Sequence, residues 1–180
     1  AEHAADSLTA AVNLAVLHWD AGERDQAVRE FDRFIDAYNT RAASLNAAEF
    51  RAVAVACRYL GAENPQLFKD ALKAFDRSIA ADGDDLDTRI ALGELFLEKY
   101  DGAEAQKLFD GVLAANPSHP RGLLGAARRL VFDGQPGADS LLLRALEVNP
   151  EFVDGRVLRA RGMLDIEDYG GAQREVDRAL

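Results

Sequence analysis

The stretch Asp101–Pro117, DGAEAQKLFDGVLAANP, decides the fold of this chain. Three small or apolar residues recur in it at spacings of four and three: Ala105, Phe109 and Val112. These spacings place the three side chains on one face of an α-helix. Asn116-Pro117 predicts the end of that helix, because proline cannot continue a helix and disfavours helical dihedral angles at the preceding residue. The stretch therefore predicts one amphipathic helix over 102–115.

The same pattern recurs along the whole chain at a nearly constant interval. Five alanines mark it: Ala27, Ala71, Ala105, Ala138 and Ala172. The gaps between successive alanines are 44, 34, 33 and 34 residues. A large apolar residue follows each alanine after four positions: Phe31, Phe75, Phe109, Leu142 and Val176. A recurrence near 34 residues is typical of stacked helical hairpins, an architecture that functions as a surface.

Helical periodicity predicts ten helices in five antiparallel pairs: 5–21, 24–38, 46–60, 65–81, 85–99, 102–115, 119–132, 135–147, 151–165 and 169–179. The pairs form one repeat array over 1–180, with units at about 5–39, 44–83, 84–117, 118–150 and 151–180. Four first helices carry a small residue about 12 positions before the alanine: Ala15, Gly93, Ala127 and Ala160. The gap of 44 indicates ten extra residues around 39–44 and 61–64, where we expect irregular stacking.

The order of these residues resembles that of the tetratricopeptide repeat (TPR) family. The unit that matches best contains Leu92-Gly93, Phe96, Ala105, Phe109 and Pro117. Asn39 and Gly83 stand where the family pattern has a proline, and no tryptophan occupies the early first-helix position. The resemblance covers nearly the whole chain. It implies an all-α, right-handed α-solenoid and a non-catalytic scaffold that binds a peptide or partner protein in its concave groove.

Composition narrows the classes of partner. The formal net charge is −10 and 48% of the residues are hydrophobic. An acidic balance argues against nucleic acid and anionic membranes, which attract concentrated Lys and Arg. No apolar run approaches the roughly 20 residues of a membrane span, so we expect no membrane insertion. The chain begins at Ala1 without methionine, so we expect a processed product or an excised piece. The single Cys57 excludes an internal disulfide and leaves a cytoplasmic or an exported location open.

No motif predicts catalysis, a cofactor or a metal site. His18 is expected to pack on the first helix, His119 to lie in a loop or at a helix start, and His3 to lie at the terminus. Cys57 lies in an apolar stretch and is expected to be buried. The acidic run 82–87 fails as an EF-hand loop, because Asp87 and Gly93 stand where glycine and glutamate are required. Helix capping explains the run. We therefore expect no enzyme.

A row of arginines is the candidate binding site, because the resemblance implies that first helices line the concave face. Its members are Arg51, Arg58, Arg121, Arg128 and Arg161. Guanidinium groups bind carboxylates by paired hydrogen bonds, which favours an acidic peptide or protein as partner. The alternative is a solvated face with ion pairs between repeats, such as Glu94 with Arg128. Some TPR proteins grip a terminal carboxylate with a set of Lys and Asn; here only Asn13 is suitably placed and no lysine joins it, so we do not expect that function.

A second function stays open, that of a structural spacer or assembly segment. Stacked repeats normally finish with a polar capping helix, whereas this sequence stops at Ala179-Leu180, on the second helix of a hairpin. That ending predicts further repeats in a parent protein or self-association through the last hairpin. The stretch 156–180 also resembles repeat regions attached to metallopeptidase-like proteins in bacteria.

Overall fold

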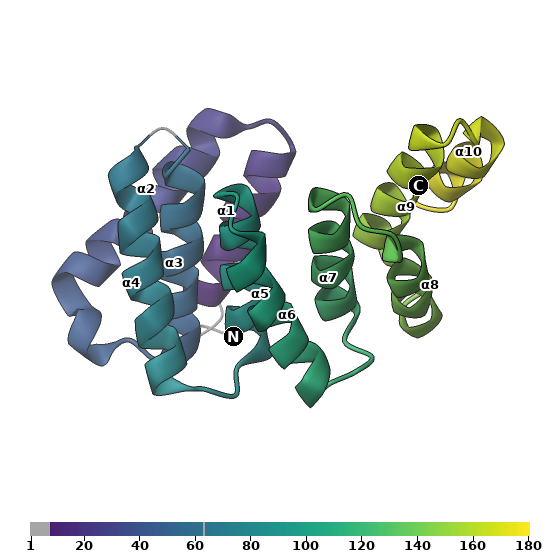
Figure 1. Ribbon diagram of the computed structural model, residues 1–180. Coiled ribbons are helices and arrows are strands. Elements are labelled where there is room, and N and C mark those ends of the chain that lie inside the picture. Colours follow the sequence, from purple (N-terminus) through teal and green to yellow (C-terminus); the bar gives the residue numbers. More distant parts are fainter. Residues whose placement is uncertain (1–7, 63) are drawn as a thin grey trace. The chain divides into compact units, whose positions relative to one another are not determined.

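The computed structural model describes residues 8–62 and 64–180, and within them it contains ten α-helices, one short 3₁₀ helix and no strand (Figure 1). The helices are α1 (Leu8–Asp20), α2 (Arg24–Arg41), η1 (Ala42–Ser44), α3 (Ala47–Leu60), α4 (Pro65–Ala81), α5 (Leu86–Glu98), α6 (Gly102–Ala115), α7 (Pro120–Phe132), α8 (Ala138–Val148), α9 (Val153–Asp165) and α10 (Tyr169–Asp177). The predicted all-α class and the ten predicted helices are confirmed.

Helix bounds agree with the periodicity to within three residues. The bounds of α4 and α6 coincide with the predicted 65–81 and 102–115. Two helices differ by three residues: α2 continues to Arg41, and α8 begins at Ala138 and not at 135. The later start of α8 has a local cause, because Gly137 precedes it with φ of +107°, outside the helical region. Residues 5–7 of the first predicted helix lie outside the described part of the chain.

Capping side chains explain where five of the helices begin. Asn46 accepts a hydrogen bond from the backbone N–H of Glu49, whose carboxylate accepts one from the N–H of Asn46. Asn64 accepts from the N–H of Gln66 while Pro65 occupies the first turn, as the sequence predicts. Three further caps have the same role: Asp101, His119 and Asp168. The expected position of His119 at a helix start is confirmed.

The extra residues of the second repeat lengthen a helix. α2 has 18 residues and passes directly into η1, which adds one tight turn before α3. Thr40 Oγ1 donates a hydrogen bond to the carbonyl oxygen of Asp36 at 2.7 Å, inside the last turn of α2. The expected irregularity around 39–44 is therefore a longer helix followed by a 3₁₀ turn.

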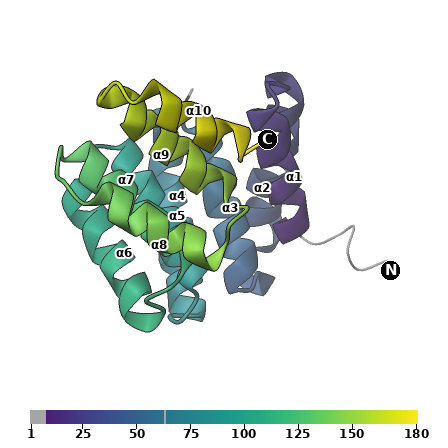
Figure 2. The same cartoon turned by 90° about the vertical axis from the view of Figure 1, so that its right-hand side faces the viewer.

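The chain forms two compact units, Ala1–Ala91 and Leu92–Leu180, and the division falls inside α5. In the first unit α1 packs on α2 and α3, and α3 also packs on α2 and α4. In the second unit α6 packs on α7, α7 packs on α8 and α9, and α9 lies between α8 and α10 (Figure 2). Each unit thus contains consecutive helical hairpins that pack on their neighbours.

The alanine pattern is the core of both units. Ala27, Ala71 and Ala105 are 0% exposed, and so are the three phenylalanines four positions later. In the second unit the Phe109 ring occupies the space between two glycines, because a β-carbon on Gly93 or Gly125 would stand 2.8 or 2.2 Å from its atoms. The small residue predicted in the first helix is therefore a packing requirement.

Four hairpin turns share a residue with left-handed backbone conformation. It recurs at equivalent places of four hairpins: Gly22 (φ +84°), Tyr100 (φ +62°), Gly134 (φ +63°) and Glu167 (φ +63°). Glycine adopts this region without steric cost, whereas a residue with a β-carbon does so at about 1–2 kcal/mol. The repeat therefore imposes the same turn on residues that differ in conformational preference.

Candidate binding surface

Arg51 belongs to a polar network in the first unit. Its guanidinium donates to Asp85 Oδ2 and lies 3.7 Å from Asp87 Oδ2. Only 18% of the Arg51 side chain is exposed. Arg51 therefore joins α3 to the start of α5. For this arginine the structure shows an ion pair between helices, which is the alternative to ligand binding that the sequence left open.

The same network continues into the core through two hydroxyl groups. Thr88 Oγ1 donates to Asp85 Oδ2 at 2.7 Å and lies 2.8 Å from Ser78 Oγ. Ser78 Oγ in turn donates to the carbonyl oxygen of Ala47 at 2.8 Å. Ser78 and Thr88 are both 0% exposed, so each buried hydroxyl group is satisfied. Ser78 occupies the position that holds Phe34 or Val112 in other repeats, and the sequence pattern did not predict this network.

Arg58 lies at the edge of an aromatic cluster in the first unit. Its guanidinium carbon is 5.7 Å from the centre of the Tyr59 ring. Tyr59 stacks on Phe31 with ring centres 5.0 Å apart and meets Trp19 edge-on at 5.4 Å. Arg58 therefore covers apolar rings in addition to presenting charge. Asn13, the other candidate of this unit, is exposed on α1.

The remaining arginines lie on two neighbouring helices of the second unit. Arg128 on α7 and Arg161 on α9 are 33 residues apart and occupy equivalent positions, and α7 contacts α9. Arg121 and Arg161 are exposed, and Arg128 is 38% exposed. Arg128 lies 3.6 Å from Glu94 Oε1, so the ion pair named in the sequence alternative is present. At this separation and exposure the pair is weak.

Exposed apolar side chains accompany these arginines. Val131 and Leu164 follow Arg128 and Arg161 by three residues and are 48% and 51% exposed, and Val157 is 51% exposed. We call the six residues together the α7–α9 surface: Arg121, Arg128, Val131, Val157, Arg161 and Leu164. Spacings of three, four and seven place the members of each helix on one face. The surface therefore combines guanidinium donors with apolar side chains.

An apolar pocket of about 350 Å³ opens beside Val131 in the same unit. Its lining comes from α7, α8, α9 and the turn before α10, and includes Leu142, Leu158, Met163 and Ile166. Gly162 is one of the lining residues, and nothing lies within 4 Å of where its β-carbon would be. The equivalent position of α7 holds Arg129. Sequence spacing did not predict this pocket, although a glycine in mid-helix is its signal.

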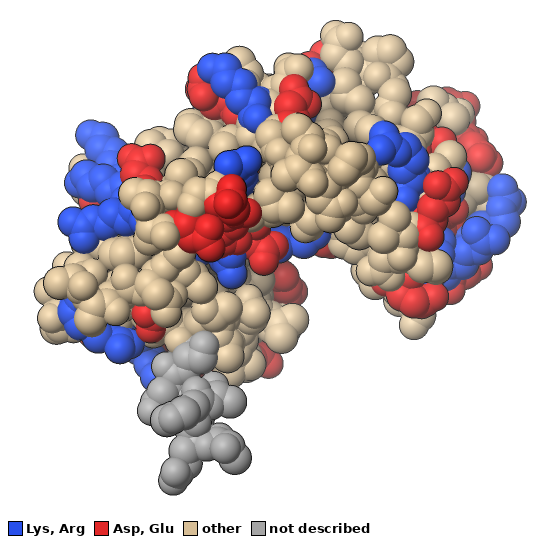
Figure 3. All heavy atoms as spheres, turned by 90° about the horizontal axis from the view of Figure 1, so that it is seen from below, with Lys and Arg blue, Asp and Glu red and all other residues tan. Residues whose placement is uncertain are grey.

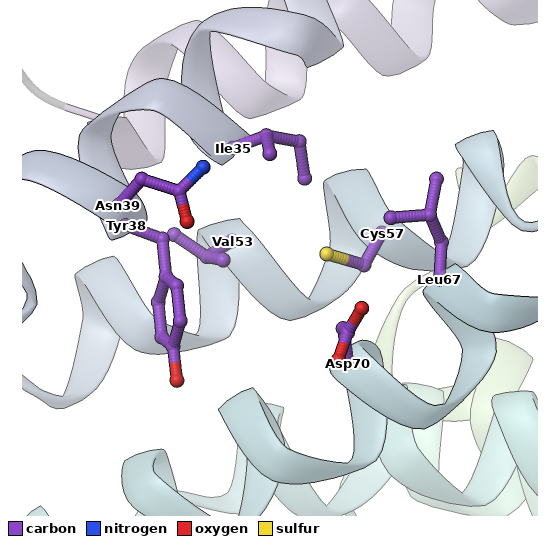
Figure 4. A pocket seen from close by; sticks show the side chains of 7 residues that line it. All are labelled: Ile35, Tyr38, Asn39, Val53, Cys57, Leu67 and Asp70. Carbon is purple, nitrogen blue, oxygen red and sulfur yellow. The ribbon is translucent and has the colours of Figure 1, made fainter.

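A smaller pocket of about 150 Å³ lies in the first unit among α2, α3 and α4 (Figure 4). The thiol of Cys57 and the carboxylate of Asp70 point into it, beside Tyr38 and Asn39 of the lengthened α2. Burial, and secondarily the charge of Asp70, raises the pKa of the Cys57 thiol to about 12. The expected burial of Cys57 is confirmed, and its thiol stays protonated at neutral pH.

Several polar side chains singled out in the sequence have local partners. Asp82 and Asp85 accept hydrogen bonds from the backbone N–H groups of Asp84 and Asp87, both at 3.0 Å, which agrees with capping. His18 is half-buried and lies 2.5 Å from Glu23 Oε2, so it is part of a polar group and not only of the packing. His3 lies outside the described residues.

Charge is dispersed on the drawn face, where Lys and Arg side chains lie among Asp and Glu side chains (Figure 3). Within residues 8–62 and 64–180, no helix is both long enough and apolar enough to cross a membrane. Over the same ranges no three His, Cys, Asp or Glu side chains group as ligands of a metal ion.

A glutamate replaces an apolar residue in the last hairpin. Glu175 is 3% exposed, where α6 and α8 have Leu108 and Leu141. Its carboxylate accepts hydrogen bonds from Arg156 at 3.0 Å and Arg159 at 2.6 Å. These ion pairs hold α10 against α9. The apolar periodicity of the sequence did not predict them.

Comparison with known proteins agrees with this architecture. Residues 66–131 match the model of the tetratricopeptide repeat. No curated protein matches the chain. Among solved structures the chain is similar to TTC0263, a thermophilic TPR protein in Thermus thermophilus, with a TM-score of 0.73 and 19% identity over 97% of this chain and 90% of that one.

Two further structures have the same fold at similar identity. One is pilF of Pseudomonas aeruginosa, with a TM-score of 0.64 and 16% identity over 96% of this chain and 74% of that one. The other is YrrB, described as a TPR protein with an unusual peptide-binding site, with a TM-score of 0.53 and 17% identity over 99% and 87%. The resemblance seen in the sequence is confirmed: the chain has the TPR solenoid fold, and residues 66–131 are its matched tetratricopeptide repeat segment.

Proposed function

We propose that this chain is a non-catalytic interaction scaffold that binds an acidic, partly apolar peptide of a partner protein on the α7–α9 surface. The observation that carries the proposal is the repetition of one motif on adjacent helices, Arg128 with Val131 and Arg161 with Leu164. A peptide that alternates carboxylates with apolar side chains fits this order. The TPR fold supports an interaction role in general, because repeat arrays function as surfaces.

Each group on the surface has a distinct part in the proposed binding. The planar guanidinium groups of Arg121 and Arg161 would orient carboxylates by paired hydrogen bonds. A ligand carboxylate would compete with Glu94 for Arg128, since the 3.6 Å ion pair is weak and half-exposed. Val131, Val157 and Leu164 would supply affinity by burying apolar area, at about 25 cal/mol per Å². Charge therefore orients the peptide and apolar contact holds it.

The similar structure YrrB gives the proposal independent support. Its description names a peptide-binding site on a TPR protein, and the two folds agree over 99% of this chain. At 17% identity the likeness concerns the fold alone, so the chemistry of the ligand is argued from the residues of this chain. The peptide class proposed here rests on the arginines and apolar residues of α7 and α9.

A peptide array with matched charge variants tests the proposal. The array carries acidic peptides with and without apolar residues, and the test protein is Arg121→Ala/Arg128→Ala/Arg161→Ala. A control removes the same charge from exposed residues of the first unit, Arg29→Ala/Arg33→Ala/Lys69→Ala. We expect the test variant to lose acidic-peptide binding at least tenfold while the control retains it. Equal binding by the two variants would sink the α7–α9 assignment.

A second candidate function is an assembly segment, and one observation favours it. The apolar residue after the fifth alanine, Val176, is 41% exposed, whereas Phe31, Phe75, Phe109 and Leu142 are 0–2% exposed. A face that is buried in four repeats and uncovered in the fifth suits a contact with another helix. Light scattering over a concentration series tests this role, since a strict monomer contradicts it unless further repeats follow in a longer chain.

A further inference from the structure

The uncovered face of α10 corresponds to a face of α6 whose partner is known. Val176 is equivalent to Phe109, and Ala179 is equivalent to Val112. In α6 these two residues lie against Gly125 and Gly122 of α7, where added β-carbons would stand 2.2 and 2.7 Å from them. The surface that covers such a face is therefore the side of a first helix.

Leu180 and Tyr169 extend the uncovered side of the last hairpin. Leu180 is 102% exposed and is equivalent to Leu113, which a β-carbon on Gly122 would approach to 3.3 Å. Tyr169 is 66% exposed and is equivalent to Gly102. A β-carbon added on Gly102 would stand 3.4 Å from the Phe132 ring. We call Tyr169, Val176, Ala179 and Leu180 the α10 face.

The first helix of the chain has the matching side uncovered. Four residues of α1 occupy positions equivalent to Gly122, Gly125, Arg129 and Phe132 of α7. They are Ala10, Asn13, Leu17 and Asp20, in the same order, and we call them the α1 face. All four are exposed, and Leu17 is 65% exposed. Leu14 lies at the border of this face and is 50% exposed. It is equivalent to Arg159 of α9, which donates a hydrogen bond to Asp139 of α8, the second helix of the preceding hairpin. The α1 face is thus the side of a first helix, the kind of surface that covers the face of α6 equivalent to the α10 face.

The two faces also complement each other in volume. Inside the second unit a large Phe109 lies against Gly125, which has no side chain. In the equivalent contact between chains, Val176 would meet Asn13, and these two side chains together have as many non-hydrogen atoms as those of Phe and Gly. Ala179 and Ala10 would replace Val112 and Gly122, with two side-chain carbon atoms in place of three. Exchanges that conserve volume are the ones that packed interfaces tolerate best.

Polar groups at the edge agree with the same register. Tyr169 would replace Gly102, and Asp20 would replace Phe132, so the tyrosine hydroxyl group can donate a hydrogen bond to the aspartate carboxylate. The Tyr169 ring would lie opposite the smaller Asp20, as the Phe132 ring lies opposite Gly102 inside the second unit. Leu17 and Leu180 would bury the largest exposed apolar groups of their faces.

We infer that this chain self-associates head to tail, the α10 face of one copy packing on the α1 face of a second copy in the register of neighbouring repeats. The inference rests on the assembly role proposed above and is independent of peptide binding on the α7–α9 surface. The contact is heterologous, because each copy uses two different faces and each face remains available once per chain.

Two single substitutions on opposite faces test the inference. Leu17→Asp alters the α1 face, and Leu180→Asp alters the α10 face; both residues are too exposed for either change to unfold the chain. Val148→Asp adds the same charge at a residue of α8 that is 52% exposed and belongs to neither face. Sedimentation velocity of the full chain, from micromolar to millimolar concentration, gives the mass of each variant and of the equimolar mixture.

Head-to-tail pairing predicts a distinctive result for the mixture. Wild type and Val148→Asp grow in mass with concentration, and each face variant alone stays monomeric. The equimolar mixture of Leu17→Asp with Leu180→Asp forms dimers and nothing larger, since each partner contributes one intact face. A monomeric wild type overturns the inference. So does a Leu17→Asp variant that associates like wild type, because contact between two α10 faces would then replace the pairing. Peptide-array binding distinguishes either failure from failure of the α7–α9 assignment.

Discussion

The ring of Phe109 lies against Gly125, so closely that a β-carbon on residue 125 would stand 2.2 Å from ring atom Cε1. Both residues are buried, Phe109 at 0% exposure. The contact joins α6 to α7 at the point where two successive repeats of the second unit meet. Its geometry shows why the Phe109 ring leaves no room for a side chain at position 125, and it sets the first prediction.

Gly125→Ala should destabilise the protein although alanine is the better helix former. Helix propensity favours alanine by about 1 kcal/mol, but the overlap with the Phe109 ring forces rearrangement that costs about 1–3 kcal/mol. We expect a lower free energy of unfolding, measured with urea. Gly162→Ala is the matched control, because nothing lies within 4 Å of its β-carbon, and it should raise stability. Equal effects at both glycines would refute the packing argument.

Glu175→Leu should destabilise the last hairpin even though leucine restores the apolar pattern of the earlier repeats. The substitution leaves Arg156 and Arg159, whose side chains are 11% and 16% exposed, without their shared carboxylate. Removing one partner of a buried ion pair costs about 3–5 kcal/mol. Thermal unfolding by circular dichroism measures the loss. Asp177→Asn, an exposed change on the same helix, should have little effect.

Glu167→Gly should stabilise the turn before α10. Glu167 has φ of +63°, which costs a residue with a β-carbon about 1–2 kcal/mol, partly offset by the greater unfolded-state entropy of glycine. We expect a net gain of up to about 1 kcal/mol in urea unfolding. The reverse change at the equivalent position, Gly134→Ala, should lose a similar amount. Stabilisation by both substitutions would show that backbone conformation does not govern this turn.

The Cys57 thiol should resist alkylation in the native protein. Burial raises its pKa from 9.0 to about 12, so the reactive thiolate is scarce at neutral pH, and only 2% of the residue is exposed. Iodoacetamide labelling followed by mass spectrometry should proceed only as fast as the chain opens. The same label should add rapidly in urea. Rapid labelling without denaturant would contradict the burial of this thiol.

The raised pKa of Cys57 also predicts a loss of stability in alkaline solution. A group whose folded pKa is raised contributes its stability below the unfolded pKa and loses it as pH rises through the folded pKa. For Cys57 this window runs from 9.0 to about 12. Urea unfolding of wild type and Cys57→Ala across the window isolates the contribution. The difference between the two proteins should change in favour of the alanine variant as pH rises.

Helix bounds were largely predictable because their determinants are local. Spacings of three and four, Asn64-Pro65 and Asn116-Pro117 act within one or two turns of the chain, so they need no tertiary information. The start of α8 differed because Gly137 adopts φ of +107°, a choice that no periodicity expresses. The extension of α2 to Arg41 likewise followed from a 3₁₀ turn that the extra residues permit.

The candidate site was only partly predictable. Equivalent positions of Arg128 and Arg161 follow from the repeat length of 33 and the contact of α7 with α9. The sequence could not tell which arginines bind neighbours, because Asp85 reaches Arg51 from another helix 34 residues away. The pocket at Gly162 was also not predicted, since a cavity depends on what surrounds a missing side chain.

By itself the sequence determined the helical hairpins and the rhythm of small and large residues, because helix periodicity and proline stops are properties of neighbouring residues. Only the tertiary structure decided how side chains from different helices meet. It places Glu175 between two arginines, closes the polar network from Arg51 to Ser78, and leaves Val176 exposed where its four counterparts are buried. Those outcomes depend on distances between helices, which no spacing along one helix encodes.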